Sequence, residues 1–259
     1  MKKSLYGFLS ALPLFILWFC TPSSAGKEKQ TEKEHSATSK TTAKNVAVLE
    51  LFTSQGCSSC PPADRLLGTY ISKENVIVLS FHVDYWDRLG WKDPFSSNEY
   101  TKRQYKYASA LNSGVYTPQL VVNGESEMVG NDENKISAAL DKLQSTQPEA
   151  NLSINNAKQE NGKVTINFTA SGKTNNSDLN IALAEKKAIT NIKAGENGGV
   201  TLTNYNVVRN FKAMQQFKDG ENAADIDIPA GLDPKNISVV LFLQKNDNNK
   251  IIAAAQAML

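Results

Sequence analysis

Residues 46–62 read Val-Ala-Val-Leu-Glu-Leu-Phe-Thr-Ser-Gln-Gly-Cys-Ser-Ser-Cys-Pro-Pro, and they set the architecture of the first half of the chain. The run 46–52 is apolar apart from Glu50, which predicts a buried strand. Pro61 and Pro62 suit the first turn of a helix, where a missing amide proton costs little. The sequence therefore predicts a strand, a short loop that carries two cysteines, and a helix.

Cys57 and Cys60 are separated by two residues at the start of this predicted helix. Two thiols at this spacing can close a small disulfide and open it again. Unpaired backbone amides and the helix dipole favour the thiolate of Cys57, so we expect its pKa to lie below the usual value. The pattern predicts a redox-active pair in which Cys57 attacks a disulfide and Cys60 resolves the mixed disulfide.

Two other interpretations of the cysteine pair remain open. Zinc sites use the same spacing, but they usually take further ligands from a second pair, and this chain has only three cysteines. A permanent disulfide is the second alternative, although so small a ring would stabilise the fold little.

The N-terminal region has the composition of an export signal. Two lysines precede the apolar stretch 5–20, and small residues follow it as far as Ala25. This pattern predicts a signal peptide over residues 1–25 and therefore an exported protein, periplasmic or secreted. A lipid anchor through Cys20 is the alternative, but the bulky residues 18–19 disfavour it.

The remainder of the chain is balanced in charge. Residues 26–44 are polar and charged, which predicts a flexible linker. The chain has 28 Lys and Arg against 26 Asp and Glu, and loss of Lys2 and Lys3 with the signal makes it formally neutral. This balance argues against a nucleic-acid-binding protein. We expect no integral membrane span once the signal is removed.

The segment 45–146 alternates between strand and helix patterns. We expect the elements in the order strand, helix, strand, helix, strand, strand, helix, with an aromatic-rich loop over residues 84–95. An Asn123-Gly124 turn joins the last two strands as a hairpin. After a linker near residue 147, the segment 150–259 consists of short alternating runs separated by Asn, Gly and Asp, which predicts a β-sandwich.

The first segment resembles the thioredoxin fold, because a strand leads into the C-x-x-C pair and Thr117-Pro118 opens the hairpin strand. The resemblance implies that the Thr117–Pro118 bond is cis, faces the cysteines and presents the backbone of Thr117 to the substrate chain. The expected fold class is an α/β thioredoxin-like domain, residues 45–146, followed by a mostly β, sandwich-like domain, residues 150–259.

More narrowly, the chain is similar to an exported thioredoxin-like family catalogued as domain of unknown function 1223. The matching stretches are residues 50–64, 82–87, 115–119, 122–124 and 206–209. The family name itself implies no reaction.

Four further residues are candidates for tuning the cysteines or for a lid over them. Thioredoxins often bury an acid six residues before the first cysteine, but Leu51 stands there and Glu50 one residue earlier, on the opposite strand face. His82 ends the second predicted strand, next to the helix that carries the cysteines. Asp84 and Trp86 begin the aromatic loop, which could line a substrate groove.

These features predict an exported thiol-disulfide oxidoreductase that acts on the thiols or disulfides of other exported proteins and needs no organic cofactor. The direction of electron flow depends on how far the fold stabilises the Cys57 thiolate. One alternative is a copper(I)-binding or delivery protein that uses Cys57, Cys60 and His82 as ligands. The other is a non-enzymatic interaction module in which the β-sandwich recognises the partner.

Overall fold

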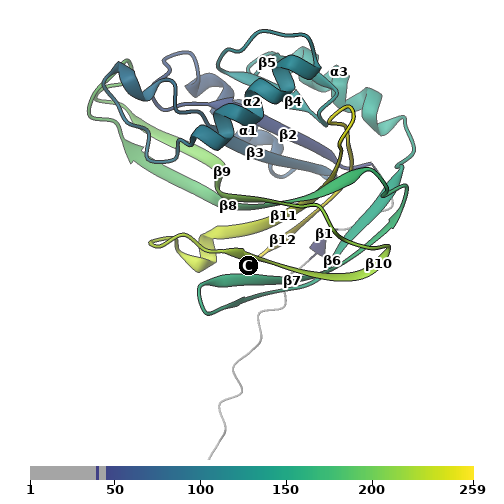
Figure 1. Cartoon of the computed structure of the whole chain (residues 1–259). Coiled ribbons are helices and arrows are strands. Elements are labelled where there is room, and N and C mark those ends of the chain that lie inside the picture. The colour runs from purple at the N-terminus through teal and green to yellow at the C-terminus, as the bar shows by residue number, and fades with distance from the viewer. Residues whose placement is uncertain (1–38, 41–44) are drawn as a thin grey trace, which may run out of the picture. The chain divides into compact units, whose positions relative to one another are not determined.

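The apolar run before the cysteines forms strand β2 (Ala47–Thr53), which is buried at all seven positions. The structure, a computed structural model, describes residues 39–40 and 45–259 (Figure 1). The elements that follow β2 in the first segment are α1 (Pro61–Tyr70), β3 (Val76–His82), the short 3-10 helix η1 (Asp87–Leu89), α2 (Asn98–Ala110), β4 (Gln119–Val122), β5 (Ser126–Val129) and α3 (Glu133–Gln144). This order agrees with the order of strands and helices predicted for the segment.

The second segment is built almost entirely of strands. They are β6 (Ala150–Glu160), β7 (Lys163–Gly172), β8 (Ser177–Asn191), β9 (Thr201–Met214), β10 (Gly220–Asp227), β11 (Ile237–Lys245) and β12 (Ile251–Met258), with the 3-10 helix η2 (Pro234–Asn236) before β11.

The expected fold class, an α/β thioredoxin-like domain followed by a β-sandwich, is wrong. The described chain is mostly β, and one nine-stranded sheet in the order β1-β12-β11-β8-β9-β3-β2-β4-β5 runs through both segments. Strands β10, β7 and β6 form a separate three-stranded sheet. Four strands of the second segment thus extend the sheet of the first instead of closing a sandwich of their own. The division into domains at residues 45–146 and 150–259 stays a prediction.

The N-terminal predictions fall mostly outside the described residues. This holds for the signal peptide 1–25, for Cys20 and for most of the linker 26–44. Within that linker, β1 (Ser39–Lys40) pairs antiparallel with β12, so these two residues belong to the sheet. None of the helices in the described ranges is long and apolar enough to cross a membrane.

The two segments meet where β3 lies beside β9. Ser80 pairs with Val207 in parallel, and the Ser80 hydroxyl donates a hydrogen bond to the carbonyl of Tyr205 at 2.8 Å. The side chain of Asn206 donates to the carbonyl of Val78 at 3.0 Å. The backbone of Asn206 is in the left-handed region. Side chains therefore reinforce a junction that has little backbone pairing.

Strand β2 is buried on both faces of the sheet. Leu49 and Leu51 pack with residues of α1 and α3, including Ala63. Val48 and Phe52 point to the opposite face and pack with residues of α2. Because both faces of β2 are covered by helices, its sequence is nearly continuously apolar and does not alternate between apolar and polar residues.

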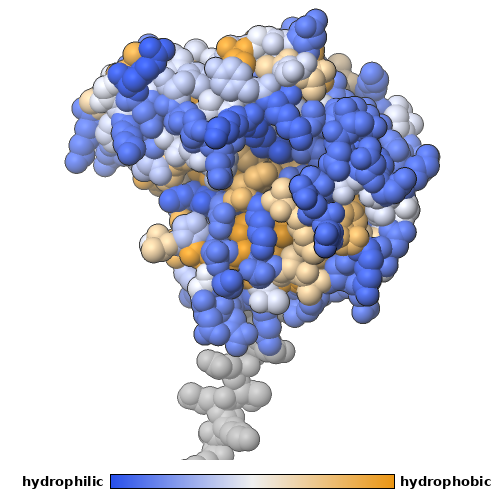
Figure 2. Space-filling view, in the orientation of Figure 1, coloured by the Kyte–Doolittle hydropathy of each residue, from blue (hydrophilic) through white to orange (hydrophobic). Residues whose placement is uncertain are grey.

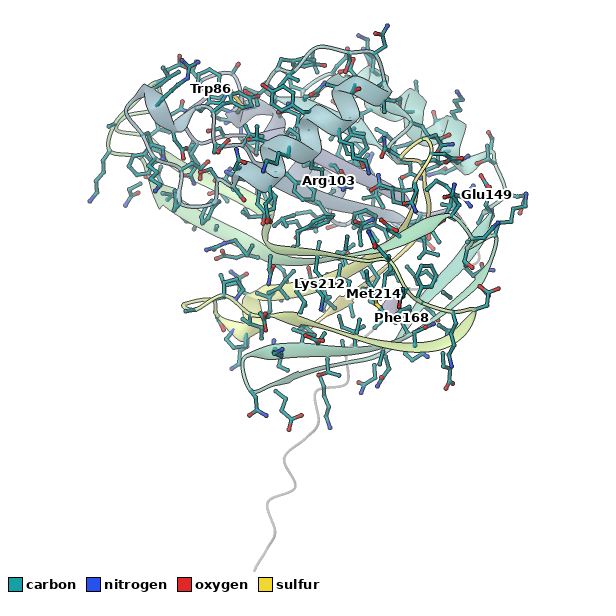
Figure 3. The ribbon with its side chains drawn as sticks, in the orientation of Figure 1. Trp86, Arg103, Glu149, Phe168, Lys212 and Met214 are labelled. Atoms are coloured by element: carbon teal, nitrogen blue, oxygen red, sulfur yellow. A yellow bond between two sulfur atoms is a disulfide. The ribbon has the colours of Figure 1, made fainter. Side chains whose placement is uncertain are left out.

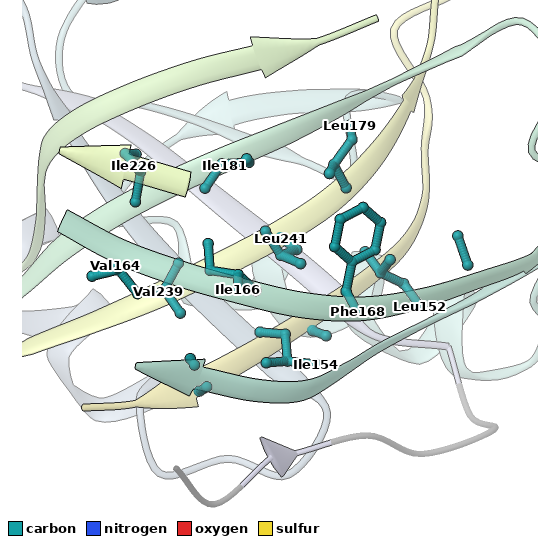
Figure 4. Close-up of a cluster of buried hydrophobic side chains, with 14 of the residues drawn as sticks. Leu152, Ile154, Val164, Ile166, Phe168, Leu179, Ile181, Ile226, Val239 and Leu241 are labelled. Carbon is teal, nitrogen blue, oxygen red and sulfur yellow. The ribbon is translucent and has the colours of Figure 1, made fainter. Parts of the chain in front are cut away.

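A second core lies between the three-stranded sheet and the neighbouring part of the nine-stranded sheet. In Figure 4, Ile166 and Phe168 of β7 point toward Leu179 and Ile181 of β8 and Leu241 of β11. On the face seen in Figure 2, hydrophobic residues gather in a band between hydrophilic regions above and below. Met214 is one of the half-buried residues at the margin of this core, and it lies in the same central region (Figure 3).

Helix α1 packs against β9 at a position where only glycine fits without movement. A methyl group at Gly68 would lie 2.8 Å from two ring carbons of Tyr205, closer than a real contact allows. Gly68 is therefore required by close approach, although glycine in the middle of a helix costs about 1 kcal/mol relative to alanine.

We expect Gly68→Ala to lower the free energy of unfolding by about 1–3 kcal/mol through overpacking, despite its better helix propensity. In a Tyr205→Ala background the same substitution should become stabilising by up to about 1 kcal/mol, because only the propensity effect remains. Urea unfolding of the four proteins of this cycle measures both values. An equal effect of Gly68→Ala in the two backgrounds would contradict the contact.

Candidate functional site

The two cysteines lie between β2 and α1, and Cys60 is the N-cap residue of α1. They form a disulfide with their Cα atoms 5.5 Å apart, and the amide of Cys60 donates to the carbonyl of Cys57 at 3.2 Å. Both cysteines have 0% exposed surface, whereas Ser58 and Ser59 between them are exposed. The predicted pair therefore exists as a disulfide that is covered by other parts of the protein.

Thr117 and Pro118 lie against this disulfide. Their peptide bond is cis, as the resemblance implies, and the carbonyl oxygen of Thr117 is 3.9 Å from the Sγ of Cys57. The indole Nε1 of Trp86 donates to the Thr117 hydroxyl at 2.8 Å. Three of the predicted positions, Cys57, Thr117 and Trp86, are thus brought together.

The aromatic loop, residues 84–95, encloses the cysteine loop from one side. Trp91 donates through Nε1 to the Gln55 side chain at 3.2 Å. Trp86 lies so close to Gly56 that a methyl group there would be 3.3 Å from its Cβ. Asp84, in contrast, is engaged by α2, since its two carboxylate oxygens accept hydrogen bonds from Thr101 and Asn98.

His82 forms a buried ion pair with an aspartate that the sequence analysis did not single out. Its Nδ1 lies 2.7 Å from Oδ2 of Asp93, and both side chains have no exposed surface. Burial alone would lower the pKa of His82, but the Asp93 carboxylate holds it above the usual value. The same Asp93 oxygen accepts a hydrogen bond from the amide of Gln55 at 2.8 Å. His82 and Asp93 therefore anchor the start of the cysteine loop.

Asp64 is a buried acid on the helix that carries Cys60. It lies four residues after Cys60, so the two side chains share one face of the helix, one turn apart. Burial raises the pKa of Asp64 to about 6, and the nearby His82 opposes part of this rise. Thr53 donates to its Oδ2 at 3.2 Å, while its buried Oδ1 has no hydrogen-bond partner among residues 39–40 and 45–259.

Asp64 could have been found in the sequence from the helical period. It stands in the buried stripe of α1 beside Ala63, Leu67 and Tyr70. A charged residue within such a stripe is either paired or functional.

Glu50 occupies a different environment. Both of its carboxylate oxygens accept hydrogen bonds from Arg103 of α2, at 3.0 and 2.7 Å, and the pair is almost fully buried. The Arg103 guanidinium also lies over several aromatic rings, including that of Phe81 at 5.5 Å (Figure 3 labels Arg103). Since Leu51 points toward α1, Glu50 faces the opposite side of the sheet, and its carboxylate serves to hold α2.

Two residues of the loop between β8 and β9 also reach the cysteines. Asn197 donates to the carbonyl of Cys57 at 3.0 Å, and Glu196 accepts from the amide of Ser58 at 2.9 Å. They lie about 140 residues away in sequence, and no local pattern marks them.

The copper alternative concerns Cys57, Cys60 and His82. In residues 39–40 and 45–259, no group of three or more His, Cys, Asp or Glu side chains is arranged to hold a metal ion. Here the cysteine sulfurs are joined in a disulfide. Nδ1 of His82 is hydrogen-bonded to the carboxylate of Asp93.

Comparison with known proteins gives the family of this chain. The model of the family described as protein of unknown function (DUF1223) matches residues 48–244. The chain belongs to this family, which confirms the family named from its motifs and says nothing of the thioredoxin superfamily. No curated protein was found to match the chain.

Solved structures similar to this chain include one over most of its length. Protein AGR_C_4864 from Agrobacterium tumefaciens is 30% identical, with a TM-score of 0.65, and the match covers 84% of this chain and 96% of that one. A DUF3823 family protein from Bacteroides ovatus is 18% identical, with a TM-score of 0.29, over 43% of this chain and 53% of that one.

The raised pKa of Asp64 predicts how stability depends on pH. A carboxyl group whose pKa is about 6 when folded and 3.8 when unfolded binds its proton more tightly in the folded state. Its favourable contribution is complete below the unfolded pKa and is lost as the pH rises through the folded pKa. Between pH 4 and pH 7 the wild type should lose about 2 kcal/mol of unfolding free energy relative to Asp64→Asn.

Urea unfolding of the oxidised proteins across this pH range measures that difference. Glu74→Gln, which changes an exposed acid, is the matched control and should follow the wild type. A difference between wild type and Asp64→Asn that does not change with pH would show that Asp64 has an ordinary pKa.

Proposed function

We propose that this protein exchanges disulfides with other exported proteins through Cys57 and Cys60. The observation that carries the proposal is the contact between the Cys57 sulfur and the carbonyl oxygen of Thr117, 3.9 Å apart, at the start of α1. A client chain paired with the backbone of Thr117 would lie beside that sulfur. The exported location rests on the signal-like sequence at residues 1–25.

The proposed reaction has two steps and moves two electrons. The Cys57 thiolate attacks one sulfur of a client disulfide, a Cys57–client disulfide forms, and the other client sulfur leaves as a thiolate. The Cys60 thiolate then attacks the Cys57 sulfur, which restores the Cys57–Cys60 disulfide and releases the second client thiolate. The client is reduced and the protein is oxidised; the reverse sequence oxidises a client dithiol.

The start of α1 supports Cys57 as the attacking group. Cys60 is the N-cap residue, and prolines occupy the first helical positions, so the loop before them lies at the positive end of the helix dipole. A thiolate is stabilised there. Cys60 lies at the base of the loop, where attack on the Cys57 sulfur is intramolecular.

Asp64 supports the step in which Cys60 acts. The Cys60 thiol must lose a proton before it attacks, and a buried carboxylate one helical turn away can accept it. With its pKa raised to about 6, Asp64 is ionised at neutral pH and is a stronger base than an exposed aspartate. Thr53 bonds its Oδ2, so we assign the proton to Oδ1.

We expect a Cys60→Ser variant to trap a mixed disulfide between Cys57 and a disulfide-containing client peptide, because the resolving thiol is gone. The Cys57→Ser variant should trap none. Non-reducing electrophoresis and mass spectrometry of the two reduced variants measure the trapped species. Absence of a mixed disulfide in both variants would contradict disulfide exchange.

A copper(I) titration, read together with the trapping assay, tests the copper alternative. Reduced wild type and His82→Ala are titrated with copper(I) against a competing chelator. Tight binding that is lost in His82→Ala, together with no trapped client, would support copper delivery instead.

Asp64→Asn should slow resolution of the mixed disulfide at pH 7 by about tenfold or more, since the proton acceptor is removed. Rapid-quench measurement of mixed-disulfide decay gives the rate, with Glu74→Gln as the control of equal charge change. A decay rate equal to that of the wild type would assign Asp64 a structural role only.

A further inference from the structure

The loop that joins β8 to β9 lies directly on the cysteine loop. The side-chain amide of Asn197 donates two hydrogen bonds, to the carbonyl of Gln55 at 2.9 Å and to the carbonyl of Cys57 at 3.0 Å. Asn197 is only 7% exposed, although it lies in the tip of this hairpin, residues 195–199. Two bonds to backbone carbonyls on the two sides of Gly56 hold this tip against the cysteine loop.

The neighbouring Glu196 brings a charge to the same place. Its carboxylate accepts a hydrogen bond at 2.9 Å from the amide of Ser58, the residue that follows Cys57. This bond lowers the pKa of Glu196, which therefore stays ionised at neutral pH. The Ser58 amide is thus paired with a carboxylate and is not free to stabilise a thiolate on Cys57.

The tip also rests on the aromatic loop. A methyl group at Gly195 would lie 3.1 Å from Cβ of Trp91, and the backbone of Gly195 is in the left-handed region. Trp91 in turn donates to Gln55, the residue held by Asn197. The tip, the indole and the cysteine loop therefore form one closed set of contacts.

These contacts conflict with an open reaction site. An attacking sulfur must touch the sulfur of Cys57, yet Cys57 has 0% exposed surface in the closed arrangement. We propose that the tip, residues 195–199, is a cover that Asn197 latches over the Cys57–Cys60 disulfide and that opens before a client reaches Cys57. This inference rests on the proposed exchange function and adds a gate to it.

The cover also has an electrostatic effect on Cys57. While it is closed, the carboxylate of Glu196 lies beside the loop in which the thiolate would form, and like charges repel. Closure therefore disfavours the Cys57 thiolate, and opening favours it. Glu196 and Asn197 are positioning residues, since they act through the backbone of the cysteine loop.

The latch is tested with Asn197→Ala in the oxidised full-length protein. Its disulfide should be reduced by dithiothreitol about tenfold faster than that of the wild type, because two hydrogen bonds that close the cover are gone. Asn191→Ala is the matched control, since Asn191 is bonded to Thr201 in the same hairpin and no bond joins its side chain to the cysteine loop. Equal rates in wild type and Asn197→Ala would overturn the cover.

A second variant controls for the possibility that Asn197→Ala accelerates reduction by unfolding the protein. Asn197→Asp keeps the shape of the side chain and removes its donors, so it should also accelerate reduction. Thermal unfolding of each variant shows whether the fold is retained. Slow reduction in a folded Asn197→Asp protein would likewise overturn the cover.

The charge is tested with Glu196→Gln, which keeps an acceptor for the Ser58 amide. The midpoint of the pH profile for alkylation of Cys57 by iodoacetamide should fall, with the thiolate fraction below the midpoint rising about two- to fivefold. Glu221→Gln, an exposed acid on β10, is the control. An unchanged midpoint would overturn the role of Glu196.

These outcomes are separable from failure of the exchange function. If Cys60→Ser traps no client, the exchange function fails whatever the reduction rates are. If Cys60→Ser traps a client and Asn197→Ala behaves as the wild type, exchange stands and the cover alone is wrong.

Discussion

The junction between β3 and β9 is the constraint on which the rest of the structure depends. Ser80 and Asn206 fasten two strands that come from opposite halves of the chain. Beyond the junction, Tyr205 packs on α1 at Gly68, and the side chain of Asn204 accepts a hydrogen bond from Gln55 at 3.0 Å. The cysteine loop is therefore enclosed by both halves. A site that looks local in the sequence is composite in the fold.

The local parts of this arrangement could be predicted from the sequence. An apolar run, two cysteines and two prolines suffice for β2, the disulfide loop and α1, because each depends on neighbours a few residues away. The joining of the two halves could not be predicted. Strand β11 is buried on both faces, and its apolar run does not show which strands it pairs with. The contacts of Asn197 could not be predicted either, because they join residues 140 positions apart in the sequence.

The sheet places two buried acids in different environments. Glu50 faces α2, and Arg103 occupies both of its oxygens, so its charge is neutralised and fixed. Asp64 faces the opposite side with one unpartnered oxygen, and burial favours its protonated form. The difference follows from the alternation of side chains along β2, where Leu51 takes the place beside α1. The alternation of β2 thus places Glu50 on the face covered by α2, away from α1 and the cysteines.

The two edges of the nine-stranded sheet have a further consequence. An open edge strand offers unpaired amides and carbonyls to other chains and invites aggregation. Here one edge is β5, with four residues, and the other is β1, with two residues that cover part of the longer β12. At one edge the outermost strand is short, and at the other β1 covers Gln256 and Ala257 of β12. Two residues of the segment expected to be a flexible linker therefore cover part of a sheet edge that would otherwise be open there.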